Sequence, residues 1–439
     1  MVVQRYGADI NGGAELHARY VAEHLARHAQ VEVLSTCARD YVSWRNEYPP
    51  GVDWVNGLPV RRFPVDRERD IRVFAQRSDR VFEQPHSYLD ELKWIDSEGP
   101  TSTPLLAHIR ANQDAYDYFI FFSYRYYHAY HGAKSVSERS ILVPTAERDE
   151  AIGLSIFPPL FRSVRAVMYN SPEERRMIQT ASNNHDVPGV VVGIGSEIAA
   201  RPHAQRFRQK YGITGRFALY VGRIDQNKGC KELFTFFMRA LPALPVSLGL
   251  VLIGNALLPI PDHPRVRHLG FLSDEDKCDA LAAADLLLMP SYYESLSMVA
   301  LEAWALGRPV LANGKCEVLR GQCIRSRAGL YYETQAEFVE TLRAIVDSRS
   351  LNDALGANGR RFFEQHYAWA VIEQKYLDML ERLAREDREP TKSMRREREP
   401  GWFARRRRVL PAAAEVLARL PSGPVIETSV QAPGLAAVR

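Results

Sequence analysis

The chain has 439 residues, of which 46% are hydrophobic and 25% charged, a composition typical of a globular protein. This excludes disorder as the main state, a collagen-like chain and a disulfide scaffold, and the length predicts two or more domains. The formal net charge is +4, yet residues 387–439 carry +5 and residues 1–386 carry −1. Because a nucleic-acid-binding protein needs a basic folded surface, nucleic acid is not expected as a partner.

The cysteines and the apolar segments indicate where the protein resides. Its five cysteines form no C-x-x-C pair and lie inside apolar patterns, so we expect free thiols in a reducing compartment. No stretch reaches the roughly 18 consecutive apolar residues of a spanning helix, and no signal-peptide pattern stands at residue 1. We therefore expect cytoplasmic residence.

Strand-like apolar runs alternate with helical patterns over nearly the whole chain, which predicts an α/β fold with parallel sheets covered by helices. A first series of strands is predicted at residues 1–5, 31–37, 118–124, 141–146 and 166–170. A second series is predicted at residues 217–221, 248–254, 266–272, 284–290, 309–312 and 329–332. Only five residues precede the turn at Tyr6, so either the first strand is short or the true start lies upstream.

The helix boundaries and the connections between the two series are also marked. Ser171, Ser273 and Thr334 are predicted N-caps with purely structural roles. Residues 190–195 form an apolar strand that runs into glycines, which predicts a hinge near residue 195. Residues 351–385 are predicted to form two helices, and residues 387–439 a basic, disordered tail.

A loop with two cations follows the first strand of the second series. Arg223 and Lys228 stand five residues apart, next to Gly222 and Gly229, between this strand and a helix. Ligands of doubly wound sheets bind beyond the carboxyl ends of the strands. The two cations can therefore converge on one diphosphate and neutralise charge on a leaving group, or they are simply solvated loop cations.

A second segment carries two carboxylates, Glu294 and Glu302, eight residues apart. The helix between them should start near Ser295 to Ser297 and stop at Gly307, which separates the carboxylates by roughly 12 Å. One can hold sugar hydroxyls and the other a ribose, while the helix N-terminus donates N–H groups to a diphosphate. Ser297 either caps the helix or binds a phosphate oxygen. Alternatively, Glu294 and Glu302 are simply carboxylates on the protein surface with no ligand.

A third segment places Gly12 and Gly13 between a strand and a helix. Small residues let the backbone approach a ligand, but the segment is not G-x-G-x-x-G and does not indicate a nicotinamide or flavin site.

Together these three segments resemble the retaining glycosyltransferases of the GT-B fold, in particular glycosyltransferase family 4. The resemblance covers about residues 1–380 and rests on the Gly-Arg-x4-Lys-Gly loop and the Glu-x7-Glu segment, about 70 residues apart. It implies two Rossmann-like domains facing each other across a cleft. Residues 1–195 would bind the acceptor, residues 196–363 the nucleotide sugar, and the helix of residues 364–386 would return to the first domain.

The resemblance also implies roles for the matching residues. Arg223 and Lys228 would hold the diphosphate, with Gly222 in the same loop, and together with Glu294, near the reacting carbon, they form the predicted catalytic set. Glu302 would bind the ribose. Gly12, Gly13 and Ser297 would complete the donor site.

The chain departs from the family pattern at one place. Many relatives carry a histidine after a strand of the first domain, whereas this chain has Pro144-Thr-Ala-Glu-Arg-Asp-Glu150. Glu147 or Asp149 takes that place at the donor sugar, or His128 or His131 reaches in from the preceding segment.

The resemblance also implies no cofactor and no metal, because in that family fixed cations and a helix terminus do the neutralising that Mg²⁺ does elsewhere. Asp274 and Asp276 form the only Asp-x-Asp, which lies in the capping box begun by Ser273. In the tail, Trp402 and Phe403 precede four arginines and an apolar stretch to Leu420. That stretch either contacts an anionic membrane at its inner face or is a solvated tail.

The predicted function is transfer of a sugar, a hexose or a related unit, from a nucleoside diphosphate to a hydroxyl of a glycan or lipid-linked acceptor, with retention at the anomeric carbon. The alternatives are a nucleotide-sugar 2-epimerase and a non-catalytic module that binds nucleotide or glycan. Similar frameworks serve many sugars, so the sequence leaves the sugar, base, acceptor, linkage and oligomeric state open.

Overall fold

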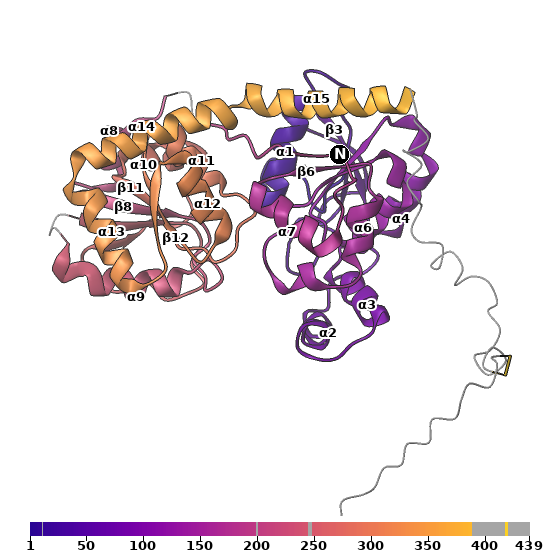
Figure 1. Ribbon diagram of the computed structural model, residues 1–439, viewed down its shortest axis with the longest axis horizontal. Helices are drawn as coiled ribbons and strands as arrows, with labels where there is room; N and C mark the ends of the chain where they lie inside the picture. Colours follow the sequence, from indigo (N-terminus) through magenta and orange to yellow (C-terminus); the bar gives the residue numbers. More distant parts are fainter. Residues whose placement is uncertain (11, 199–200, 245–247, 389–417, 420–439) are drawn as a thin grey trace, which may run out of the picture. The chain divides into compact units, whose positions relative to one another are not determined.

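The computed structural model describes residues 1–10, 12–198, 201–244, 248–388 and 418–419. The predicted tail therefore lies almost wholly outside the described residues. The compact part of the chain, Met1–Thr391, contains two mainly parallel sheets and their helices (Figure 1).

The first half of the chain builds the first sheet. Its strands are β1 (Val33–Thr36), β2 (Gly51–Val55), β3 (Leu58–Phe63), β4 (Phe119–Phe122), β5 (Ser140–Val143), β6 (Ala166–Tyr169) and β7 (Gly189–Val191). Its α-helices are α1 (Gly13–Leu25), α2 (Ile71–Glu83), α3 (Tyr88–Glu98), α4 (Thr103–Ala111), α5 (Tyr127–Ser135), α6 (Phe157–Ser163) and α7 (Pro172–Ser182). Short 3₁₀ turns lie at Gln113–Ala115, Ser137–Arg139 and Glu150–Gly153.

The second half builds the second sheet. Its strands are β8 (Arg216–Val221), β9 (Leu248–Ile253), β10 (Val266–His268), β11 (Leu286–Met289), β12 (Val310–Asn313) and β13 (Gly329–Tyr332). Its helices are α8 (Ala204–Tyr211), α9 (Cys230–Ala240), η4 (Leu241–Ala243), α10 (Asp274–Ala283), α11 (Met298–Ala305), α12 (Glu317–Ser326), α13 (Gln335–Asp347), α14 (Arg349–His366) and α15 (Trp369–Arg388).

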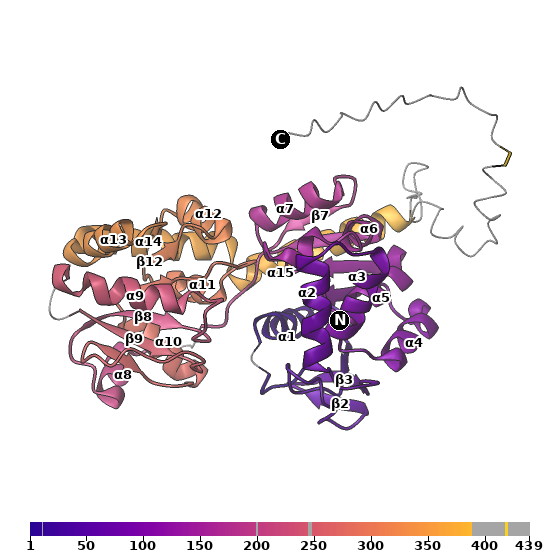
Figure 2. The same ribbon diagram turned by 90° about the horizontal axis from the view of Figure 1, so that it is seen from below.

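The first sheet differs from the predicted series at its start and at its edge. Val2 makes only isolated parallel bridges, to Leu34 of β1 and to Phe121 of β4, so the predicted strand of residues 1–5 is reduced to a bridge that joins β2-β3-β1 to β4-β5-β6-β7. The antiparallel pair β2–β3 was not predicted (Figure 2). Four of the five residues of β2 are exposed, so this edge strand lacks the apolar run that marks a buried strand.

The second sheet has the strand order β10-β9-β8-β11-β12-β13, and its paired strands are parallel. Alternate strand residues enter two different apolar clusters. Leu219 and Leu287 pack with residues of α10 and α11, while Tyr220 and Leu288 pack with residues of α9 and α13. Burial on both faces explains why the inner strands β9, β8, β11 and β12 are mainly apolar in sequence, whereas the edge strand β10 is partly exposed.

The predicted helix starts are observed. Ser171, Ser273 and Thr334 each cap a helix by accepting a hydrogen bond from the backbone N–H three residues on. The two predicted helices after residue 350 are α14 and α15. Trp369 of α15 lies against Tyr20 and stacks on His24, both on α1, so the last helix packs on the first half of the chain.

Candidate active site

One cavity of about 740 Å³ lies at the carboxyl ends of strands from both sheets. Strand ends of this kind are where open α/β sheets bind their ligands. Every site residue predicted from the sequence lines this cavity: Gly12, Gly13, Glu147, Asp149, Gly222, Arg223, Lys228, Glu294, Ser297 and Glu302. Residues as far apart in the chain as Gly12 and Glu302 thus line the same cavity.

Lys228 and Glu294 form an ion pair inside the cavity, with 2.8 Å between Nζ and Oε1. Gly229 permits this meeting, since its φ is +72° and a Cβ there would lie 2.0 Å from the carbonyl oxygen of Pro290. Burial works against the charged amine, but Glu294 and Glu147 outweigh it and raise the pKa of Lys228. The lysine therefore stays protonated at neutral pH.

Arg223 lies in the same loop and is about half exposed. Its guanidinium contacts Asp225, whose second oxygen accepts a hydrogen bond from the backbone N–H of Lys228 at 2.8 Å. The Tyr220 hydroxyl donates to the Arg223 carbonyl at 2.7 Å. Asp225, which sequence reasoning missed, thus fixes the shape of the loop that presents both cations.

Glu302 lies little more than one turn into α11 and is almost fully buried. Lys277 of α10 donates to its Oε1 at 3.0 Å and also contacts Asp274 at 3.2 Å. Burial raises the pKa of Glu302, and Lys277 opposes that shift. Lys277 was missed because it stands in a helix that the sequence marks only by its cap; the packing of α10 beside α11 brings it to the cavity.

The start of α11 settles one of the open alternatives for Ser297. Its hydroxyl oxygen accepts from the backbone N–H of Ala300 at 3.2 Å, and the hydroxyl lies 3.7 Å from the Met289 sulfur. Ser297 is therefore the N-cap, and Gly307 follows the last turn with a φ of +67°. Both helix boundaries agree with the prediction.

The two glycines before α1 have different surroundings. A Cβ on Gly12 would lie 2.1 Å from Glu15 Oε2, which belongs to a carboxylate paired with Arg5 at 2.6 Å. A Cβ on Gly13 would meet no atom within 4 Å. Gly12 is thus needed for the approach of Glu15, whereas Gly13 leaves space in the cavity.

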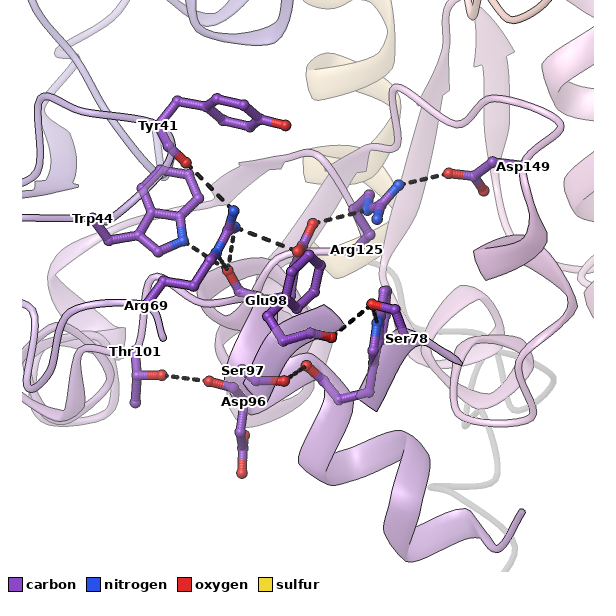
Figure 3. A network of polar contacts seen from close by, with 12 residues as sticks. Tyr41, Trp44, Arg69, Ser78, Asp96, Ser97, Glu98, Thr101, Arg125 and Asp149 are labelled. Atoms are coloured by element: carbon purple, nitrogen blue, oxygen red, sulfur yellow. Dashed lines mark hydrogen bonds and ion pairs between the residues drawn. The ribbon is translucent and has the colours of Figure 1, made fainter. Parts of the chain in front are cut away.

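Glu147 and Asp149 follow β5 and face different partners. Burial raises the pKa of Glu147 to about 7, with Lys228 opposing and Glu294 adding to the shift. Asp149 pairs with Arg125 at 2.6 Å, and Arg125 also contacts Glu98 at 3.1 Å. Figure 3 shows this chain of contacts continuing from Glu98 to Arg69 and Trp44. Asp149 is therefore anchored in a polar network.

The two histidines considered as substitutes do not line the cavity. His128 is fully buried, and its Nε2 contacts the Phe122 carbonyl at 3.2 Å, while His131 pairs with Asp96. A histidine that the sequence analysis overlooked, His17 of α1, does line it. It stands four residues after Gly13, and only the orientation of α1 turns it toward the cavity.

The part of the chain that the structure describes contains neither a ready-made metal site nor a membrane-spanning helix. No group of three or more His, Cys, Asp or Glu side chains is arranged to hold a metal ion. No helix has the length and apolar character needed to cross a membrane.

Comparison with known proteins identifies the family. The sequence model described as "Glycosyl transferases group 1" matches residues 204–362, the stretch that carries the Arg223 loop and α11. Residues 204–362 therefore carry the domain of this family. The expected resemblance to glycosyltransferase family 4, and with it the glycosyltransferase class, is confirmed, and the comparisons favour neither alternative function.

Individual relatives extend the match beyond this region. The chain is 27% identical to D-inositol 3-phosphate glycosyltransferase of a Nocardioides species over 245 residues, 54% of this chain and 48% of that protein. The match thus spans about half of that relative. The chain is also 24% identical to a GDP-mannose-dependent monoacylated alpha-(1-6)-phosphatidylinositol monomannoside mannosyltransferase of Corynebacterium glutamicum, over 76% of this chain and 96% of that protein.

Solved structures share the fold over most of the chain. Sucrose-phosphate synthase of Thermosynechococcus elongatus superposes with a TM-score of 0.64 at 16% identity, over 87% of this chain and 95% of that one. HepE of Anabaena in complex with UDP superposes with a TM-score of 0.62 at 16% identity, over 87% and 99%. The predicted GT-B fold is confirmed.

Proposed function

We propose that this chain transfers a sugar from a nucleoside diphosphate sugar to a hydroxyl of a glycan or lipid-linked acceptor, with retention at the anomeric carbon. The observation that carries the proposal is the shared cavity, in which Lys228 meets Glu294 while Arg223 and Glu302 line the same space. Cations for a diphosphate and carboxylates for hydroxyl groups are the chemistry that a nucleotide sugar requires.

The donor is proposed to bind along the second half of the chain. Its diphosphate takes Arg223, Lys228 and the N-terminal N–H groups of α11 as partners. As Lys228 turns from Glu294 to a phosphate oxygen, Glu294 becomes free to accept hydrogen bonds from sugar hydroxyls. Glu302, held in place by Lys277 at 3.0 Å, accepts from the ribose hydroxyls.

The proposed step breaks the bond between the anomeric carbon and the phosphate oxygen and forms a bond to the acceptor oxygen on the same face. The acceptor proton passes to the departing phosphate, so no separate base is required. The cations stabilise the charge that develops on the leaving diphosphate, and the reaction therefore needs no resident metal or cofactor.

Relatives suggest the first donors to try. HepE has been solved with UDP, and the mannosyltransferase of C. glutamicum depends on GDP-mannose. We propose a UDP- or GDP-linked hexose as donor. We also propose that residues 1–195 bind the acceptor and residues 196–363 the donor, with a hinge near residue 195.

The test is nucleotide release from UDP-glucose and GDP-mannose, with and without acceptors, in buffer that contains EDTA. Lys228→Ala should lower the rate by about 10²- to 10³-fold, as loss of one charge-stabilising donor does elsewhere. Lys315→Ala is the matched control, since Lys315 also pairs with a glutamate, Glu232 at 3.2 Å, but does not line the cavity. Equal rates for Lys228→Ala and wild type, or a rate that vanishes in EDTA, would contradict the proposal.

We further propose that the sequence from Trp402 to Leu420 contacts the inner face of an anionic membrane. Aromatic and basic residues beside an apolar stretch support this contact, and it would bring the enzyme to a lipid-linked acceptor. Cosedimentation with phosphatidylglycerol vesicles should be lost on truncation after Arg388. Equal sedimentation of both forms would argue against it.

A further inference from the structure

Three neighbouring strands of the first sheet, and the bridge at Val2 beside them, present polar side chains where they end at the cavity. Gln4 stands two residues after Val2, which bridges β4 at Phe121. Ser123 directly follows β4, Thr145 lies two residues after β5, and Asn170 directly follows β6. All four line the cavity. We call them, together with His17 of α1, the polar wall.

Three residues of the polar wall hold buried polar atoms without a partner in the described part of the chain. These atoms are Gln4 Oε1, Asn170 Oδ1 and both ring nitrogens of His17. The three residues are at most 1% exposed. Buried polar atoms are almost always hydrogen-bonded, and an unpaired one is costly. Their position on a cavity wall therefore points to a ligand that supplies the missing hydrogen bonds.

The backbone of the polar wall is held in an uncommon conformation. Ser123 has a φ of +66° and Thr145 a φ of +49°, and their hydroxyl oxygens lie 2.9 Å apart. A β-branched residue rarely adopts a positive φ, and such strain collects at functional sites. The strained turns place two adjacent hydroxyls at the ends of two adjacent strands.

The polar wall offers hydrogen bonds without free positive charge. Burial lowers the pKa of His17 to about 3, so its neutral ring presents one donor and one acceptor. The cations nearest in the chain are already engaged: Arg5 pairs with Glu15, and Arg125 pairs with Glu98 and Asp149. A phosphate would find no unpaired cation among these groups, whereas sugar hydroxyls match them.

We infer that the polar wall binds an uncharged, hydroxyl-rich acceptor, a sugar or polyol unit, rather than a sugar phosphate. This inference rests on the proposed glycosyl transfer and adds the chemical class of its acceptor. The bound hydroxyls would supply hydrogen bonds to Gln4, His17 and Asn170. The acceptor would lie in the cavity that also holds the Lys228–Glu294 pair, because Asn170 itself donates to Ser295, next to Glu294, at 3.3 Å.

The experiment compares neutral acceptors (methyl α-glucoside, maltose, myo-inositol) with their phosphorylated counterparts (glucose 6-phosphate, maltose 1-phosphate, inositol 1-phosphate). Nucleotide release and melting temperature are both measured, because a melting shift needs no turnover. Neutral acceptors should raise the rate of nucleotide release and the melting temperature more than the phosphorylated acceptors do. Gln4→Met and His17→Phe should raise the KM for the neutral acceptor at least tenfold, and the KM for the donor less than threefold.

Gln322→Met is the matched control, because Gln322 is a fully buried glutamine with unpaired side-chain atoms outside the cavity. It should leave acceptor KM and the melting shift as in wild type. Preference for phosphorylated acceptors, no melting shift with any neutral compound, or equal losses in Gln322→Met would overturn the inference. No nucleotide release from any donor, with the neutral-acceptor melting shift intact, would instead count against the proposed function alone.

Discussion

The charges of the cavity are paired before any ligand binds. Lys228 contacts Glu294, Lys277 contacts Glu302, and Arg223 contacts Asp225. In the proposed reaction, a diphosphate would therefore displace carboxylates from these cations instead of meeting unpaired cations. The same binding event would neutralise the phosphate and free a carboxylate for the sugar, so the protonation state of nearby Glu147 would affect it.

Glu147 should make the protein less stable as the pH rises. Its pKa is about 7 in the folded state against 4.5 as the ordinary value, so between these values the folded state binds more protons than the unfolded state. The free energy of unfolding then falls with rising pH, by at most about 3 kcal/mol for a shift of this size. Glu147→Gln should remove this part of the pH dependence.

Urea denaturation at pH 5 and pH 8 measures the effect. Glu150→Gln, which alters an exposed carboxylate three residues on, serves as the control and should keep the wild-type dependence. A Glu147→Gln protein whose stability still falls as steeply as wild type between the two pH values would refute the burial argument.

Among the elements, α15 has the most influence on how the two halves meet. Trp369 at its start stacks on His24 of α1, and Glu373 contacts both His24 and His28. The connecting segment runs directly beneath this ring, because a Cβ on Gly195 would lie 2.5 Å from two ring atoms of Trp369. The connection is thus packed between α1 and α15, where Glu197 also contacts His24 at 2.7 Å.

Gly195→Ala should destabilise the protein by about 1–3 kcal/mol, because the added methyl group overpacks the contact with Trp369. The melting temperature measures the loss. Gly153→Ala is the matched control, since a Cβ there meets nothing within 4 Å. Unchanged melting temperatures for both variants would show that the connecting segment accommodates the added methyl group without loss of stability.

At the scale of the whole molecule, ion pairs link helices of the two sheets. Arg325 of α12 binds both oxygens of Glu173 of α7, with 3.0 Å for the Nη2–Oε2 pair. Gly321 makes room for this carboxylate, as a Cβ there would lie 2.2 Å from it. Arg148, next to Glu147, contacts Glu317 of α12. These contacts hold α7 and Arg148 of the first half against α12 of the second half. They therefore influence the distance between the two halves at the cavity.

Removing the Glu173–Arg325 pair should weaken catalysis without touching the cavity. Glu173→Ala, Arg325→Ala and the double variant should each lower kcat/KM about tenfold, with a coupling energy of about 1 kcal/mol in the cycle. Arg320→Ala, on the same helix but paired with Glu333, should have little effect. Additive single effects would mean that the pair is not what holds the walls together.

The sequence determined the strands of the second sheet and β1 and β4 to β7 of the first, the helix caps, and the residues of the two charged segments, but it missed β2 and β3 and extended the bridge at Val2 to a strand. These features are local: an apolar run, a cap or a Gly-flanked turn is set by neighbours a few residues away. Only the tertiary structure decided that Lys277 reaches Glu302 and that Asp225 shapes the cation loop. It also decided that His17 and Gln4, unremarkable in sequence, lie on one polar wall. Those contacts join residues from separate helices and strands, and burial then sets their charge states, which no local pattern specifies.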